Sequence, residues 1–91
     1  MPYKVNKLEV FKRQQEIMVL TKLESGRQAR VIAFNGGPNM IKRLENLGLL
    51  RGKTIKKVSN NPFKGPVVVK IDQVELAIGY RMASRITVEP I

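Results

Sequence analysis

The side chains that most often carry out chemistry in proteins are absent from this sequence or lack the partners they need. The chain contains no histidine and no cysteine. This removes the commonest general base and metal ligand, and it also removes thiolate zinc sites and cysteine nucleophiles. No serine or threonine has an evident activating base. We therefore predict no catalytic residue and expect that the protein is not an enzyme.

The carboxylates do not follow a pattern typical of metal binding. From residue 18 onward they are scattered, and no two share a helix face at a coordinating spacing: Glu24, Glu45, Asp72, Glu75 and Glu89. The same segment carries thirteen basic residues against five acidic ones, and its net charge of +8 repels a divalent cation. We predict no metal site and no cofactor.

The segment NGGP at 35–38 lies at the N-terminus of a predicted helix. A helix N-terminus can bind anions, but this segment lacks the lysine and hydroxyl residue of a phosphate-binding loop. We interpret it as a turn.

One helix is predicted over residues 38–47, with Pro38 suited to its first turn. Steps of three and four place four apolar side chains on one face: Met40, Ile41, Leu44 and Leu47. Gly48 follows the last helical leucine, where helices often end in a left-handed residue. Leu49 is then expected to fold back on the helix, and Gly52 to turn the chain into a strand. We assign Leu44, Gly48 and Gly52 structural roles.

The rest of residues 18–91 reads as short strands separated by turns. Apolar and β-branched runs predict strands near 28–35, 53–58, 67–71, 74–78 and 86–88, with a turn or single helical turn at 80–84. In the first run apolar residues fall on both parities, which indicates a strand covered on both sides or a tightly curved barrel. In the second, Ile55 and Val58 lie on opposite faces. About five strands and one helix favour a mainly β fold, a small, partly open barrel.

Residues 1–17 lack the strand-like pattern that begins at Met18. The pattern NKLE at 6–9 matches a capping box, so this segment fits either a short helix or a frayed tail. We treat it as an N-terminal extension of a single domain at 18–91. No apolar run approaches the ~18 residues of a membrane span, and the first ten residues lack the apolar core of a signal peptide, so we expect a cytoplasmic protein.

Several segments together resemble the FeoA family: LTKLESG, ARVI, RLENLGLLRG, NPFKGPVVVKI, ELAI and ASRITVE. The resemblance covers about 18–91 and implies an SH3-like barrel. It also implies an accessory or adaptor role in ferrous iron uptake, docking on the cytosolic portion of a FeoB-like membrane transporter at the inner face of the membrane. Gly79 to Met82 depart from the family pattern of an arginine followed by an acidic turn, and residues 1–17 have no counterpart.

The expected partner surface combines the helix, the turn after it and the loop at 60–66. Basic side chains there would steer an acidic partner, and apolar ones would contact it: Lys42, Arg43, Leu47, Leu49, Arg51, Lys53, Pro62, Phe63 and Lys64. For the leucines, burial in the core is the competing interpretation. A groove near the helix would also allow weak self-association.

The alternative function is nucleic-acid binding by a small basic β-barrel, because the whole chain has a formal charge of +10. Such barrels usually expose aromatic side chains for base stacking. The sequence has only five aromatic residues, and no predicted strand pairs them. We therefore place this function second, and expect no specific nucleic-acid partner.

Overall fold

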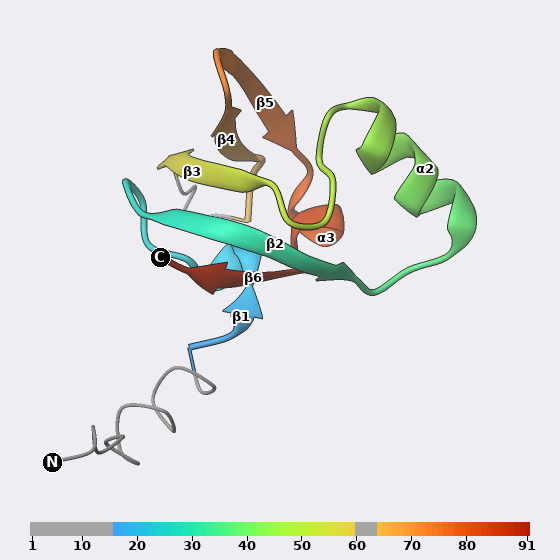
Figure 1. The fold of residues 1–91 in the computed structure, drawn as a ribbon, viewed down its shortest axis with the longest axis horizontal. Coiled ribbons are helices and arrows are strands. Elements are labelled where there is room, and N and C mark those ends of the chain that lie inside the picture. Colours follow the sequence, from blue (N-terminus) through green and yellow to red (C-terminus); the bar gives the residue numbers. More distant parts are fainter. Residues whose placement is uncertain (1–15, 60–63) are drawn as a thin grey trace, which may run out of the picture.

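The computed structural model describes residues 16–59 and 64–91. Its elements, drawn in Figure 1, are β1 (Met18–Val19), the 3-10 helix η1 (Leu20–Lys22), β2 (Gln28–Phe34), α2 (Pro38–Asn46), β3 (Thr54–Ser59), β4 (Val67–Ile71), β5 (Val74–Ile78), α3 (Tyr80–Ala83) and β6 (Ile86–Pro90). The helix or tail predicted for 1–17 falls outside these residues except for 16 and 17, as does the 60–63 part of the predicted loop.

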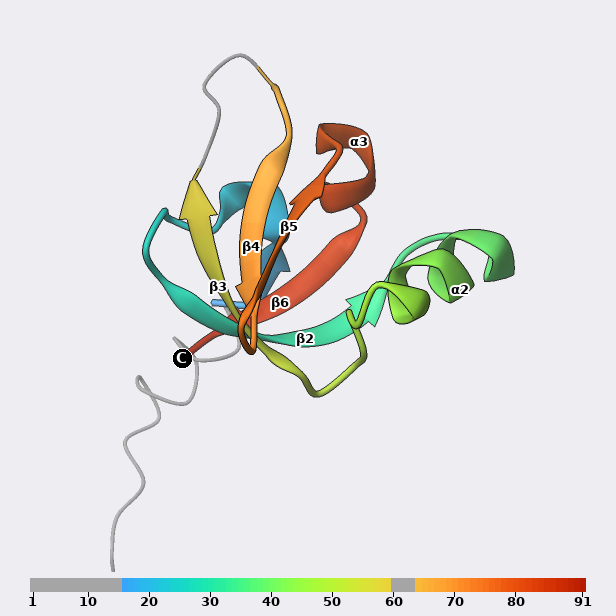
Figure 2. The ribbon, with the colours of Figure 1, turned by 90° about the horizontal axis from the view of Figure 1, so that it is seen from above.

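All six strands form one antiparallel sheet in the order β1-β6-β2-β3-β4-β5. The sheet bends around its inner face (Figure 2), and within the described ranges no ladder joins β5 to β1, so the barrel stays open. The predicted mainly β, partly open barrel is confirmed. The sheet has one strand more than predicted, because β1 is only two residues long and gives no periodic signal.

The apolar residues of β2 fall on both parities because the strand contains a register shift. Val31 pairs with Val88 of β6, whereas Ala33 pairs with Thr87, so β2 carries one extra residue at this point. Val31 is buried before the shift, and Phe34 packs against the core after it. A bulge of this kind also bends the strand, which fits the curvature of the sheet.

The core lies inside this bend and is lined by alternate residues of the strands. On β4 and β6 the alternation is regular, and every second residue is buried. The buried apolar residues are Leu20, Leu23, Ala29, Val31, Leu44, Leu49, Ile55, Val67, Val69, Ile71, Ile78, Ala83, Ile86 and Val88. Each large side chain in this set stabilises the fold by roughly 1.5–3 kcal/mol relative to exposure.

Helix α2 ends as the Leu-Gly-Leu spacing predicts. Gly48 has φ of +95°, its N–H donates to the carbonyl of Glu45 at 2.9 Å, and the Leu49 N–H donates to the carbonyl of Leu44 at 3.0 Å. This pair of hydrogen bonds defines a left-handed helix end of the Schellman type. Leu44 and Leu49 are both fully buried, so the apolar contact that accompanies this motif is present. Gly52, at φ +88°, then turns the chain into β3.

Strand β3 begins and ends one residue later than predicted. The Lys53 N–H donates to the carbonyl of Leu50 at 3.0 Å, which makes Lys53 part of the preceding turn. Ile55 is buried and Val58 is 39% exposed, on opposite faces as predicted. The inward position after Ile55 is occupied by a lysine, Lys57, which is fully buried.

Candidate functional site

Helix α2 and the turn after it present a mixed basic and apolar surface. Lys42 and Arg43 are exposed, and Leu47 and Leu50 are each nearly half exposed. Leu49 was expected to contact a partner, but it is fully buried. That expectation is wrong, because the left-handed helix end turns Leu49 inward onto the core.

The other described residues that were predicted to contact a partner lie just before β3 and β4. Arg51 and Lys64 are exposed. Lys53 is partly buried, and its Nζ lies 2.9 Å from Oδ2 of Asp72 in the β4–β5 turn, so its charge is already paired. Two nominated residues lie outside the described ranges: Pro62 and Phe63. The contact role of the predicted residues that are exposed therefore stays a prediction: Lys42, Arg43, Leu47, Arg51 and Lys64.

A hollow of about 370 Å³ lies between α2 and α3, and the sequence analysis did not identify it. Met40 of α2 contributes one side, and Gly79, Arg81, Met82 and Arg85 contribute the rest from α3 and its flanks. About forty residues separate these two parts of the chain, so no local pattern links them. The only sequence signal was the departure from the family pattern at 79–82.

The walls of this hollow are apolar and its rim is cationic. Met40 and Met82 are half-buried and pack against the core, whereas Arg81 and Arg85 are exposed. None of the described residues that line the hollow is acidic. Methionine adapts its shape to an incoming apolar group, and arginine binds carboxylates through two parallel hydrogen bonds. This arrangement is suited to an apolar side chain that is flanked by an acidic one.

Lys57 is the second feature that sequence reasoning missed. Its Nζ lies in the core and donates hydrogen bonds to the carbonyls of Leu20 at 3.0 Å, Thr21 at 3.1 Å and Leu23 at 2.6 Å. Burial lowers the pKa of this amine from its ordinary value of 10.5. The three hydrogen bonds use all three ammonium donors and tie β3 to η1. The signal was available, because Lys57 shares the parity of the buried Ile55.

Two further observations concern the described part of the chain. No three histidine, cysteine, aspartate or glutamate side chains within it lie together as cation ligands. None of its helices is long and apolar enough to cross a membrane.

The family comparison gives one match over most of the chain. The profile of the FeoA domain matches residues 18–90. A comparison with curated protein sequences gave no match.

Solved structures with the same fold include two FeoA proteins. An iron uptake regulatory protein, FeoA, is 29% identical, with a TM-score of 0.77 and coverage of 82% of this chain and 99% of the other. The FeoA protein from Chlorobium tepidum is 31% identical, with a TM-score of 0.74 and coverage of 81% and 70%. A manganese-dependent transcriptional repressor is 20% identical over 42% of its own length, with a TM-score of 0.76, and shares the fold alone.

Proposed function

Because this chain belongs to the FeoA domain family, we propose that it is a non-enzymatic accessory module that docks on the cytosolic part of a FeoB-type ferrous iron transporter. The role in ferrous iron transport follows from the family and is supported by similarity to two FeoA structures. Docking on the transporter is the more specific part of the proposal. The observation that carries it is the hollow between α2 and α3.

The hollow supplies what a protein contact needs at its centre. Interfaces gain most of their affinity from a few side chains that enter well-packed pockets and lose water there. Met40 and Met82 offer an apolar lining of this kind. We propose that one apolar side chain of the transporter enters between them.

The charges around the hollow define the rest of the partner segment. Arg81 and Arg85 line the hollow and are exposed at its rim. Cations at a rim mainly raise the association rate and reject basic partners. The preferred segment therefore places aspartate or glutamate beside its apolar anchor.

Charge reversal at the rim tests this proposal. The double variant Arg81→Glu/Arg85→Glu should weaken binding to the purified cytosolic part of a FeoB-type transporter by at least about tenfold. Both side chains are exposed, so the fold should survive. Biolayer interferometry on the immobilised transporter domain measures the change.

The matched control is Arg27→Glu/Lys56→Glu, which makes the same charge change at two exposed positions that do not line the hollow, one just before β2 and one on β3. This variant should bind within about threefold of the unmodified protein, because long-range attraction between exposed charges is screened. Equal losses in both double variants, or no loss at the rim, would refute docking at the hollow.

A further inference from the structure

The outer face of β2, β3 and β4 carries a row of polar and basic side chains. Strand register places Gln28 opposite Lys56, and Lys56 opposite Lys70. All three are exposed. This row crosses the middle of the sheet and is separate from the hollow between α2 and α3.

The two lysines of this row repel each other. Like charges directly opposite on neighbouring strands destabilise a sheet. Neither Lys56 nor Lys70 forms an ion pair within the ranges that the structure describes. Two acids lie nearby: Asp72, which is bound to Lys53 at 2.9 Å, and Glu75, which faces Lys70 from β5. A bound anion between the lysines would relieve their repulsion.

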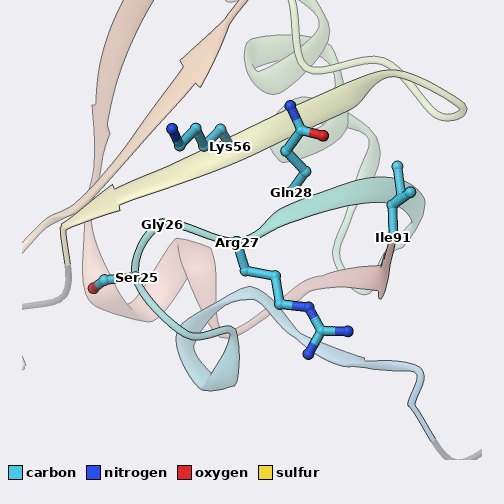
Figure 3. A pocket seen from close by; sticks show the side chains of 6 residues that line it. All are labelled: Ser25, Gly26, Arg27, Gln28, Lys56 and Ile91. Atoms are coloured by element: carbon cyan, nitrogen blue, oxygen red, sulfur yellow. The ribbon is translucent and has the colours of Figure 1, made fainter.

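Two adjacent hollows flank Lys56. One, of about 320 Å³, is lined by Gln28, Thr54, Ile55, Lys56, Lys70 and Asp72. The other, of about 500 Å³, is shown in Figure 3 and is lined by Ser25, Gly26, Arg27, Gln28, Lys56 and Ile91. They share Gln28 and Lys56, so they adjoin at these two side chains, and we call the pair the track. Lys70 lines one part of it and Arg27 the other.

We propose that this track binds the phosphate backbone of single-stranded nucleic acid without reading its sequence. One phosphate would lie between Lys56 and Lys70, and the next near Arg27. The hydroxyls of Ser25 and Thr54 would donate further hydrogen bonds. None of the described residues that line the two hollows is aromatic, so these residues offer no base stacking, the usual basis of base contacts in such grooves.

A polymer fits this track better than a single small anion. Both hollows are open to solvent, where one phosphate held by one or two lysines binds weakly. A chain of phosphates adds contacts and releases counterions at each one, so its affinity grows with the number of cations engaged. Binding is then weak, within roughly 10⁻⁴–10⁻⁶ M at physiological salt, and strongly salt-dependent.

Fluorescence anisotropy with a labelled oligothymidylate of about twelve nucleotides tests the proposal. The two phosphates bound by the track predict a slope of log K against log salt of about −1.4, since each neutralised phosphate on a single strand contributes about −0.7. The double variant Lys56→Gln/Lys70→Gln should bring this slope to about −0.7 and weaken binding about tenfold at low salt.

The control is Lys42→Gln/Arg43→Gln, which removes the same charge from α2. This variant should keep a slope near about −1.4. Equal effects in the two double variants would show that only net charge matters, and would overturn the site. The sheet-face variant should also keep its affinity for the transporter domain, so failure here and failure of the proposed docking are distinguishable.

Three further measurements complete the test, and the last two of them exclude other sources of phosphate. Amide chemical shifts recorded with the oligonucleotide should change at Gln28, Lys56 and Lys70, and changes confined to α2 would contradict the site. Pyrophosphate that displaces the oligonucleotide at equal phosphate concentration would show a small-anion site. Vesicles of anionic phosphatidylglycerol that bind more tightly than the oligonucleotide would show a membrane surface. Either result would overturn the proposal.

Discussion

At the residue scale, Lys57 is the least expected side chain in the core. A buried ammonium is costly unless its donors are all satisfied, and three backbone carbonyls satisfy them here. The Leu20 carbonyl also accepts the Leu23 N–H at 3.1 Å, so the Lys57 ammonium matters most for the carbonyls of Thr21 and Leu23 at the end of η1. Lys57 therefore stabilises the join between the first turn of the domain and the sheet.

Replacing Lys57 with methionine should destabilise the domain by about 1–3 kcal/mol, because buried carbonyls lose their donor while the side-chain volume is nearly kept. Urea denaturation measures the change. Lys56→Met is the matched control, since that neighbour points to solvent, and it should change stability by less than about 0.5 kcal/mol. Equal effects at the two positions would contradict the role given to Lys57.

The pH dependence of stability tests the same residue. Burial lowers the pKa of Lys57 in the folded state below the ordinary 10.5. Between these two pKa values the unfolded chain binds more protons than the folded one, so stability rises with pH through this window. Below the folded pKa the cost of the buried charge is fully present. The stability of the unmodified protein relative to Lys57→Met should therefore increase as pH approaches 10.5, and a constant or falling difference would refute this.

Gly48 offers an independent test of the helix end. A Cβ at this position would meet no atom within 4 Å, so any cost of a side chain comes from the backbone at φ +95° alone. Gly48→Val should cost at least about 1–2 kcal/mol, whereas Gly48→Asn should cost less because asparagine tolerates this conformation. Chemical denaturation of both variants gives the comparison. An equally small loss for valine and asparagine would mean that Gly48 does not control the helix end.

At the element scale, local patterns predicted most of the structure. The helix predicted at 38–47 ends one residue earlier, at Asn46. This helix, the hairpin of β4 and β5, the helical turn at 80–83 and the last strand all have strong periodicity or turn residues next to them. Errors arose where a tertiary contact decided the outcome. The bulge in β2 appears only when β6 pairs with it, and Lys57 enters the core only because η1 supplies acceptors.

The candidate site was less predictable than the elements. Leu49 was predicted both to fold back on the helix and to contact a partner, and only the structure shows that its full burial excludes the contact. The hollow needs Met40 of α2 to lie near α3, which the tertiary fold decides and local spacing does not. Charge could be counted from sequence, but pairing such as that of Lys53 with Asp72 could not.

The position of the Met40 side chain depends on the absence of a side chain at Gly36. A Cβ there would overlap the terminal Sδ and Cε atoms of Met40. Gly36→Ala should therefore push Met40 into a different position, with a stability loss below about 1 kcal/mol because the methionine end is flexible. Transporter binding in the interferometry assay should fall severalfold.

Gly37→Ala is the control for this change, because a Cβ at Gly37 would meet nothing within 4 Å. Its affinity for the transporter domain should match that of the unmodified protein. If both alanine variants bind equally well, the position of Met40 does not matter for docking.

At the scale of the whole molecule, most basic side chains have no acidic partner among the described residues. The chain carries +10, yet the described part contains only two ion pairs, one between Arg30 and Glu89 and one between Lys53 and Asp72. Two basic surfaces follow, one around the hollow of α2 and α3 and one on the outer face of the sheet. Net charge alone would treat them alike, and the proposals above give them different partners. The division into an extension at 1–17 and a domain at 18–91 stays a prediction.

Methionine methyl spectra test the central proposal, docking at the hollow, most directly. The sequence has four methionines. Met40 and Met82 line the hollow, and Met18 lies in β1, outside it. In ¹³C-methyl-labelled protein titrated with the cytosolic part of a FeoB-type transporter, the Met40 and Met82 signals should shift or broaden to saturation while Met18 stays unchanged. Saturable binding that leaves both hollow methyl signals unchanged would contradict the account.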